Sequence, residues 1–474
     1  MLDGFDLAAV VFGLSLIATF ALAWIGRRAS RRDTGDRDLA GRGLNRWLVG
    51  LSAAATGNSG FIVTGAVGLG YVGGLQWTLI PLGWLLGDLL FWFLVPERLN
   101  RMARRADATT LSELLGDGLS GPSARLLRRL VAVVLTVFLA TYTAAQWLAG
   151  QKFLSSAFGF GGYAAFLLFS VTIVAYSTLG GFRGSVYVDT MQAVISLCST
   201  VLALVFIAAV ALADGAAFAV NIQDAPAGFF SLAPNAQYGA SLGVLFGFAA
   251  AAFGFSMSQP QVITRYFAGS SPEETRSARW IYIGFIQVTW LAMTVFGAVL
   301  RGVMPGLPDP ESGLVVFFDT LAHPVVAGLI FAYVYAIIGS TANSIIVAVS
   351  QSIRRDLLPG GAGERKERAT PFWIIAAVGV VTIVLSFALA GNVFTIATGA
   401  FSKMGAAIAA PVVIKVFRFR HDATSLTLAV LSGLAAAYAW EALGFATVLN
   451  EAGVGMVVGL LVNRMYCGLR QYRV

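Results

Sequence analysis

Long apolar runs alternate with short polar connections along almost the whole chain. A helix needs roughly 20 apolar residues to cross the hydrocarbon core of a bilayer, and run after run approaches or reaches that length. The pattern predicts an all-α integral membrane protein with thirteen transmembrane helices. The expected spans are residues 6–25, 47–69, 75–96, 127–150, 161–180, 186–212, 240–262, 279–300, 325–350, 371–390, 393–414, 424–446 and 452–469.

The basic residues predict the orientation. With the N-terminus outside, 29 of the 32 Lys and Arg fall on the cytoplasmic side, and the long connection from Asp214 to Tyr238 has neither. No Lys or Arg precedes the first run, whereas Arg27 and Arg28 follow it, so we expect an uncleaved helix rather than a secretory signal. The expected location is the plasma or inner membrane, with the C-terminus in the cytoplasm.

Composition excludes several classes of protein. Hydrophobic residues make up 57% and charged residues 12%, about half the charged fraction of a soluble domain. The net charge of +8 follows the topology, so no nucleic-acid partner is expected. Two Cys and two His are too few for a disulfide framework or a histidine-rich metal site. No nucleophile, base and orienting group occur together, so we do not expect an enzyme.

Small and polar residues interrupt the second span at Thr56, Gly57, Asn58, Ser59 and Gly60. Gly costs about 1 kcal/mol in a helix relative to Ala, and Asn and Ser compete for backbone hydrogen bonds. Irregular backbone at bilayer depth is tolerated where it is buried or lines a wet cavity, and its carbonyls can then hold a cation. The alternative is a small-residue packing face, which explains the glycines but not the adjacent Asn and Ser.

A similar interruption returns in the seventh span, where residues 249–260 end in Ser-Met-Ser-Gln-Pro. Two broken helices at corresponding positions indicate a five-plus-five inverted-repeat transporter with its site near the bilayer midplane. Residues 1–474 then form a single transmembrane domain. Its parts are an extra N-terminal helix (6–25), repeat one (47–212), repeat two (240–414) and two extra C-terminal helices (424–469).

Other polar residues lie inside predicted spans. Ser340, Thr341, Asn343 and Ser344 place oxygens on adjacent turns of span nine, an arrangement that suits Na⁺, although Ser and Thr also bond back to their own helix. Asp189, near the end of span six, is either functional or a helix cap.

Asp88 and Lys403 lie deeper in their spans and are expected to face the bundle interior or water. A snorkelling side chain is the alternative near a span end.

Several stretches together resemble the sodium/solute symporter family, and most closely its proline-transporting members. The resemblance covers essentially the whole chain. The matching stretches are Leu39–Trp47 (LAGRGLNRW), Leu51–Ala53 (LSA), Ser59–Gly60, Tyr176–Phe182 (YSTLGGF), Val188–Gln192 (VDTMQ), Gln259–Pro260 before Arg265, and Ser340–Thr341.

The resemblance implies sodium-driven import of a small organic solute by alternating access, with Na⁺ as the coupling ion and no other cofactor. Its expected sodium ligands are the carbonyls of Ala55, Asn58 and Ile337 and the hydroxyls of Ser340 and Thr341. A second sodium site, found in some relatives, maps onto Asp189, Ser340, Asn343 and Ser344. The expected partners are Na⁺, the solute and the bilayer, with no obligate protein partner.

The solute pocket departs from the proline-type pattern. Gly57 stands where those members have an aspartate, and Ala252 and Ser256 stand where they have aromatic residues, although Tyr142 matches their tyrosine. The solute is therefore expected to be an amino acid, proline-like, or another small carboxylate. The candidate solute-binding residues are Ser59, Gly60, Tyr142, Phe255 and Ser256.

Three alternatives stay open. The same fold also occurs in sensors fused to signalling kinases, although only four residues follow Arg470, which leaves no room for a kinase. A channel is disfavoured because broken helices indicate an occluded site. Asp88 and Lys403 could change how transport is coupled to ions, since a buried Lys can bind and release a proton. The alternative is that Lys403 pairs with a carboxylate and has only a structural role.

Overall fold

The computed structural model describes residues 4–31, 37–233, 238–358, 370–388, 393–447 and 449–471, and throughout these ranges the chain is helical without β-strands. Nine helices in the described ranges are long and apolar enough to cross a membrane, or up to ten when one bent pair counts as a span. The all-α expectation is confirmed. The count of thirteen crossings stays a prediction.

The longer helices are α1 (Gly4–Ser30), α7 (Gly121–Phe158), α8 (Gly162–Ala213), α10 (Tyr238–Ser258), α13 (Arg279–Val303), α15 (Pro324–Ser352), α18 (Val393–Val416), α19 (Ala423–Ala442) and α20 (Glu451–Gln471). The shorter helices are α2 (Arg46–Gly57), α3 (Val67–Gly73), α4 (Leu79–Leu94), α5 (Pro96–Ala106), α6 (Leu111–Gly116), α9 (Gly215–Asn221), α11 (Pro260–Ala268), α12 (Pro272–Ser277), α14 (Gly313–Leu321) and α17 (Phe372–Ser386). Short 3₁₀ or π-helical segments are η1 (Arg37–Arg42), η2 (Ile62–Ala66), η3 (Gly74–Thr78), η4 (Ile222–Asp224), η6 (Pro310–Ser312), η7 (Ile353–Leu357) and η8 (Phe445–Thr447).

Helices and crossings are counted differently because one bent helix can supply two crossings. The predicted spans 161–180 and 186–212 both fall within α8, whose 52 residues would extend about 78 Å if straight, against a hydrocarbon core of about 30 Å. Gly181 (φ 58°, ψ −157°) interrupts α8 in a conformation that side chains other than glycine rarely adopt. The span predicted at 371–390 corresponds to α17, and residues 389–390 lie outside the described ranges.

Both predicted helix interruptions are present. Helix α2 ends at Gly57, Asn58 is extended (φ −88°, ψ 96°), and helix resumes at Gly60 and continues into the π-helical η2. Gln259 (φ −95°, ψ 89°) separates α10 from α11, which are bent by 62°. Pro260 explains the second break, because proline lacks the N–H that continues a helix and disfavours helical backbone at the preceding residue.

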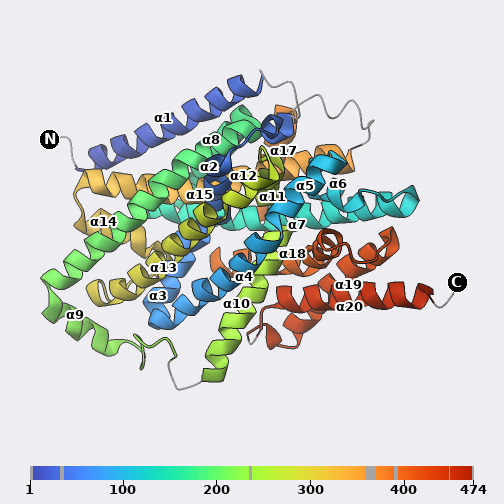
Figure 1. The fold of residues 1–474 in the computed structure, drawn as a ribbon. Coiled ribbons are helices and arrows are strands. Elements are labelled where there is room, and N and C mark those ends of the chain that lie inside the picture. Colours follow the sequence, from blue (N-terminus) through green and yellow to red (C-terminus); the bar gives the residue numbers. More distant parts are fainter. Residues whose placement is uncertain are drawn as a thin grey trace.

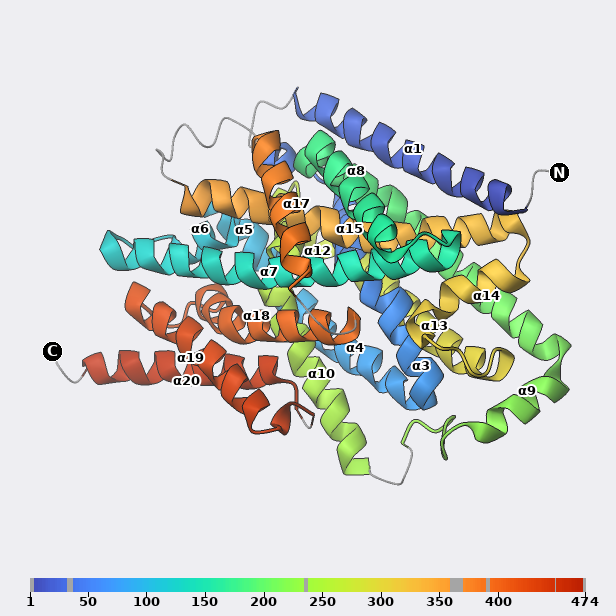
Figure 2. The same cartoon turned by 180° about the vertical axis from the view of Figure 1, so that it is seen from behind.

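The most enclosed element is α15, in which every residue from Ile330 to Ser352 is buried. Helix α1 lies along the outer surface of the bundle, whereas α19 and α20 pack together on the opposite side (Figures 1 and 2). Gly26 makes the contact between α1 and α8 close, since an added Cβ would lie 2.4 Å from Cα of Gly184. Helices α1, α7 and α8 thus pack along α15, and the broken helices contact it through α2 and α11.

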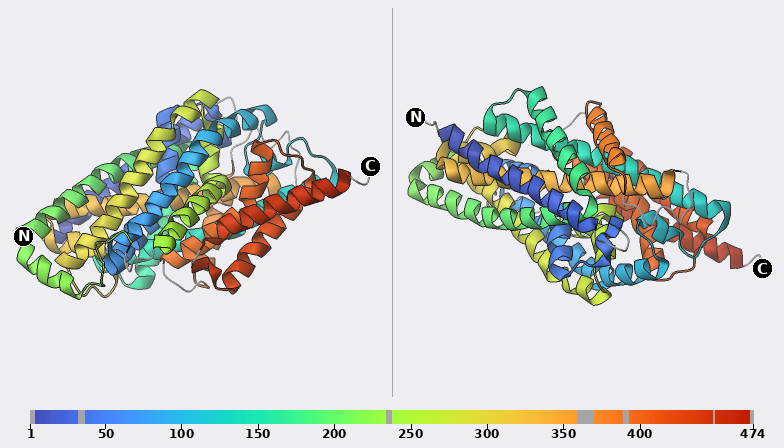
Figure 3. Two further views of the ribbon diagram at one scale, coloured as in Figure 1. Left: turned by 60° about the horizontal axis from the view of Figure 1, so that its bottom comes forward. Right: turned by 90° about the horizontal axis from the view of Figure 1, so that it is seen from above.

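The start of α1 and the end of α20 lie at opposite ends of the bundle (Figures 1 and 3). Such a separation is what an odd number of crossings predicts. Which end faces the cytoplasm stays a prediction.

Candidate functional site

The interruption of α2 and the middle of α15 bring five oxygen atoms together inside the bundle. Ser340 Oγ donates to the carbonyls of Ala55 (2.9 Å) and Ile337 (3.0 Å). Thr341 Oγ1 lies 3.2 Å from the carbonyl of Asn58 and 3.4 Å from that of Ile337. All five residues are at most 3% exposed. The residues expected as sodium ligands are thus neighbours in space.

This cluster has the composition of a site for a hard monovalent cation. Its oxygens are neutral carbonyls and hydroxyls, which replace the hydration shell of such an ion without a full negative charge. The carbonyl of Thr56, which sequence reasoning did not include, also lies 3.1 Å from Thr341 Oγ1. The hydroxyls now donate to these carbonyls, and each hydroxyl has lone pairs with which it could instead bind a cation.

Asp189 on α8 forms a buried ion pair that sequence reasoning missed. Arg265 Nη2 lies 2.9 Å from Asp189 Oδ2, and both side chains are fully buried. The guanidinium also donates to the hydroxyls of Ser185 (2.9 Å), Ser344 (2.7 Å) and Ser52 (3.1 Å). A buried charge needs such a set of partners, since removing one member of a buried pair costs about 3–5 kcal/mol.

Arg265 follows the seventh predicted span in the sequence, and the structure places it on α11, where it is 0% exposed. The pairing could not be read from the sequence, because Arg265 and Asp189 are 76 positions apart. The only signal was its place shortly after the Gln259–Pro260 break.

Two of the residues expected at the second sodium site meet directly: Ser344 Oγ donates to Asp189 Oδ2 at 3.2 Å. Asn343 joins the same cluster through Ser185, to which its Nδ2 donates at 2.9 Å, whereas Ser340 lies with the first cluster. Among the described residues, Asp189 Oδ1 and Asn343 Oδ1 are buried and accept no hydrogen bond. The cluster therefore retains two unused oxygen acceptors beside the ion pair.

A small cavity lies next to the break in α2. Of the candidate solute-binding residues, Ser59, Tyr142 and Phe255 line it, whereas Gly60 and Ser256 do not. Its free space holds little more than one water-sized sphere, so this conformation is nearly closed. Sequence reasoning missed most of the lining. The full set of lining residues is Gly57, Ser59, Phe61, Ile62, Trp84, Tyr142, Phe255, Tyr282, Ile286, Trp290 and Phe401.

Aromatic rings dominate the wall of this cavity. Trp84 contacts Phe255, Trp290 and Phe401, with ring centroids 5.1, 5.3 and 5.9 Å away. Phe61 meets Trp290 edge to face at 5.0 Å. None of the lining residues is charged. Phe61 comes from the segment just before η2, and the other four rings come from α4, α10, α13 and α18. In the sequence, an aromatic residue on such a helix is indistinguishable from one that faces lipid.

Asp88 lies behind this wall. It is one helical turn after Trp84 on α4 and is fully buried, and Ser256 Oγ donates to its Oδ1 at 3.3 Å. Its Oδ2 has no hydrogen-bond partner among the described residues.

Lys403 contacts two carboxylates, with its Nζ 2.9 Å from Glu441 Oε2 and 3.1 Å from Glu451 Oε1. These ion pairs connect α18 with the ends of α19 and α20. Lys403 is thus paired, whereas the carboxyl of Asp88 is only partly satisfied.

Comparisons with known proteins identify the family. The model of the sodium:solute symporter family matches residues 38–433. The osmoregulated proline transporter OpuE of Bacillus subtilis (strain 168) is 24% identical, with 97% of this chain and 93% of that protein aligned. The sodium/proline symporter of Haemophilus influenzae (strain ATCC 51907 / DSM 11121 / KW20 / Rd) is 26% identical over 92% of this chain and 89% of that protein.

A solved structure shares the fold. The substrate-bound, outward-open Na⁺-coupled sialic acid symporter superposes with a TM-score of 0.81, covers 98% of both chains and is 18% identical in sequence. The long apolar helices and the family match together make this chain a multi-pass membrane transporter rather than an enzyme, with Na⁺ as its coupling ion. The chain belongs to the sodium:solute symporter family.

Proposed function

We propose that this chain imports a small organic ammonium compound, such as a proline-like amino acid, together with Na⁺ by alternating access. The observation that carries the proposal is the convergence of Ala55, Asn58, Ile337, Ser340 and Thr341 at the break in α2. A sodium ion held there would tie α2 to α15. Binding energy at that contact can then favour one conformation of the transporter over another, as coupling requires.

The proposed architecture has thirteen crossings in one domain, with an outside N-terminus and a cytoplasmic C-terminus. Repeat one covers residues 47–212 and repeat two covers 240–414. The breaks in α2 and α10–α11 support this division, because inverted-repeat transporters place discontinuous helices at corresponding positions of their two halves. The separation of the chain ends also supports an odd number of crossings.

A second sodium ion is proposed at Asp189, with Asn343 and Ser344. Support comes from the two buried oxygens, Asp189 Oδ1 and Asn343 Oδ1, that have no donor among the described residues. Arg265 already neutralises the other carboxylate oxygen, Oδ2. The arginine therefore competes electrostatically with this second ion, and its displacement would strengthen the site.

The solute's positive group is proposed to bind among the aromatic rings. Aromatic faces attract ammonium groups, an interaction worth about 2 kcal/mol when it is desolvated. Asp88 behind the wall has a carboxyl oxygen, Oδ2, without a hydrogen-bond partner among the described residues, and this oxygen can accept from an ammonium group. The break in α2 has fewer free donors for a carboxylate, because its backbone N–H groups already have partners. The N–H of Gly60 donates to Gln146 Oε1 (3.0 Å) and that of Phe61 donates to Ser59 Oγ (3.3 Å). An amino acid or betaine is thus favoured over a plain carboxylate.

Lys403 is proposed to stabilise the packing of α18 against α19 and α20. Its two glutamate partners support this structural role over a role in proton coupling.

The test is uptake of labelled proline, glycine betaine and sialic acid into proteoliposomes. The vesicles are loaded with potassium and diluted into sodium (an inward gradient), loaded with sodium and diluted into equal sodium, or held in potassium on both sides. We expect accumulation of an ammonium-bearing solute only with the gradient. Uptake of every solute at the same rate without the gradient contradicts the proposed coupling, and preference for sialic acid contradicts the ammonium site.

A matched pair of variants tests the aromatic cavity. Trp290 and Trp280 both lie on α13, but Trp290 lines the cavity whereas Trp280 is 62% exposed on the outer surface. Trp290→Leu is expected to weaken solute affinity about 30-fold, equivalent to about 2 kcal/mol, and Trp280→Leu to leave it unchanged. Equal effects of the two substitutions contradict the assignment.

A further inference from the structure

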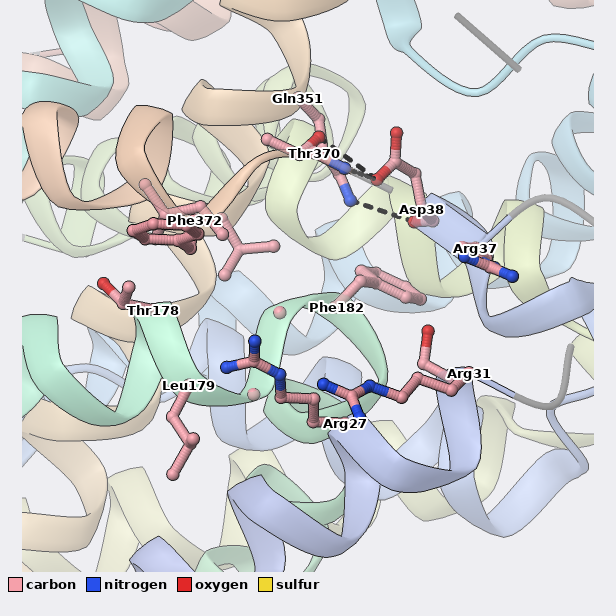
Figure 4. Close-up of a pocket in the computed structure, with 15 residues that line it drawn as sticks. Arg27, Arg31, Arg37, Asp38, Thr178, Leu179, Phe182, Gln351, Thr370 and Phe372 are labelled. Carbon is pink, nitrogen blue, oxygen red and sulfur yellow. Dashed lines mark hydrogen bonds between the residues drawn. The ribbon is translucent and has the colours of Figure 1, made fainter. Parts of the chain in front are cut away.

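A second, larger pocket lies at the end of α1, and none of its lining residues lines the small cavity beside the break in α2. Water-sized spheres can occupy about 200 Å³ of this pocket, against about 20 Å³ in the small cavity. Three arginines line the pocket. Arg27 lies in the last turn of α1, Arg31 follows the end of α1 directly, and Arg37 begins η1. Figure 4 shows Arg27 and Arg31 extending from this end of α1 toward the bend of α8. The pocket therefore has a strongly basic rim.

These three guanidinium groups form no hydrogen bond or ion pair with any described residue. Among the described residues that line the pocket, the acidic one is Asp38, and it is already bound. Its Oδ2 accepts from Arg354 (3.2 Å) and Arg355 (3.1 Å), and its Oδ1 from the backbone N–H of Thr370 (2.8 Å). Figure 4 shows Asp38 turned toward Thr370.

Arg27 and Arg31 are one helical turn apart and share a face of the chain, where like charges repel. Gathering three arginines around one pocket is unfavourable unless an anion joins them. Planar guanidinium groups bind phosphate with paired hydrogen bonds, so a phosphate group is the anion that this set of donors suits best.

We propose that this pocket binds the phosphate headgroup of an anionic phospholipid. Helix α1 lies on the outer surface, and only 17% of its apolar stretch is buried within the protein. Leu14 and Ile17 are 61% and 66% exposed, which leaves an apolar face along which acyl chains can lie. Basic pockets between helices at the cytoplasmic surface are suited to such headgroups.

The neighbouring Trp24 supports a position of the end of α1 at the level of the lipid headgroups. It is 45% exposed, and the guanidinium of Arg28 lies 3.7 Å from the centroid of its ring. Tryptophan and arginine in this combination are typical of the level of the lipid headgroups. The end of α1 thus places the arginines where phosphates are concentrated.

The headgroup site adjoins the region of the ion pair through Phe182. Phe182 lines the pocket, and the guanidinium of Arg265 lies 5.1 Å from its ring centroid. Gly181, at the bend of α8, lines the same pocket. A bound headgroup therefore holds α1 and the bend of α8 together next to Arg265.

The test is lipid retention measured by native mass spectrometry, after delipidated protein is mixed with equal amounts of phosphatidylglycerol and phosphatidylcholine. The wild type is expected to retain phosphatidylglycerol selectively. Each arginine is expected to contribute about fivefold to the affinity, so the variant Arg27→Gln/Arg31→Gln/Arg37→Gln should bind phosphatidylglycerol about 100-fold more weakly. The control Arg28→Gln removes a neighbouring charge that does not line the pocket, and should weaken binding by much less than fivefold.

Further arms separate the possible outcomes. The variant Arg27→Lys/Arg31→Lys keeps the charge and is expected to retain the lipid more strongly than a double glutamine variant, which excludes loss through misfolding. Inorganic phosphate at 10 mM (about a physiological level) is expected not to displace the lipid. Equal retention by the wild type and the triple variant overturns the proposal, as does displacement by phosphate alone, which identifies a soluble anion as the ligand.

Discussion

Replacing Ser340 and Thr341 together with alanine removes two oxygens from the proposed sodium site and leaves its backbone carbonyls in place. Both hydroxyls are fully buried and lie within 3.2 Å of carbonyls from α2. A buried polar group that loses its partner costs roughly 1–3 kcal/mol. At the lower limit the two losses amount to about 2 kcal/mol, so we expect the half-saturating sodium concentration to rise at least about 30-fold.

The same hydroxyls also connect α15 to α2 without sodium. Hydrogen bonds between membrane helices contribute about 0.6 kcal/mol each on average, so the variant should lose only about 1 kcal/mol of stability and still fold. Sodium binding is therefore measurable in the variant. Solute affinity should fall only through its coupling to sodium.

The assay is the thermal unfolding midpoint of purified protein as sodium replaces potassium at constant ionic strength, which requires no knowledge of the solute. Ser350→Ala is the matched control, because Ser350 lies on the same helix, is fully buried and donates only to the carbonyl of Ile346 (2.6 Å). An unchanged half-saturating sodium concentration in the double variant refutes the assignment. So does an equal shift in the control.

Asp189→Asn keeps the shape of the side chain but leaves Arg265 without its counter-ion. We therefore expect the protein to lose about 3–5 kcal/mol of stability and to change its sodium dependence. Wild-type sodium dependence in this variant would make the aspartate a passive cap. Lys403→Met is expected to lower thermal stability, since two glutamates lose their partner, while the pH profile of uptake stays as in the wild type. A shifted profile would assign Lys403 to coupling. A cysteine at Ala227 should react with an impermeant reagent from outside intact cells and one at Ala362, outside the described residues, should not; the reverse result contradicts the proposed orientation.

Local chemistry made the helix breaks predictable from the sequence. Glycine, asparagine and proline act on the backbone of their own residue or its neighbour, so the ends of α2 and α10 follow from Gly57, Asn58 and Pro260 wherever the helices pack. The apolar runs likewise predict spans from length alone. Crossings were harder to match to helices, because Gly181 bends α8 without ending it.

The lining of the small cavity beside the break in α2 was predicted only in part. Ser59 and Phe255 lie next to the two breaks, and Tyr142 matched the family pattern. Trp84 and Trp290 came from unbroken helices, and an aromatic residue in an apolar span has the same local pattern whether it faces lipid or a cavity. Their convergence depends on how four helices pack.

The sequence by itself determined the membrane environment, the broken helices and the residue types that can hold sodium, because each depends on neighbours along the chain. Only the tertiary structure decided which of these groups meet. Ser340 and Ala55 are 285 positions apart, yet their oxygens are 2.9 Å from one another. Arg265 has the same charge as an arginine in a loop, but the packing of α11 against α2 and α15 removes it from water and turns it toward Asp189. A charge taken out of water must find its partner inside the protein, and that partner is set by the packing of helices that are distant in sequence.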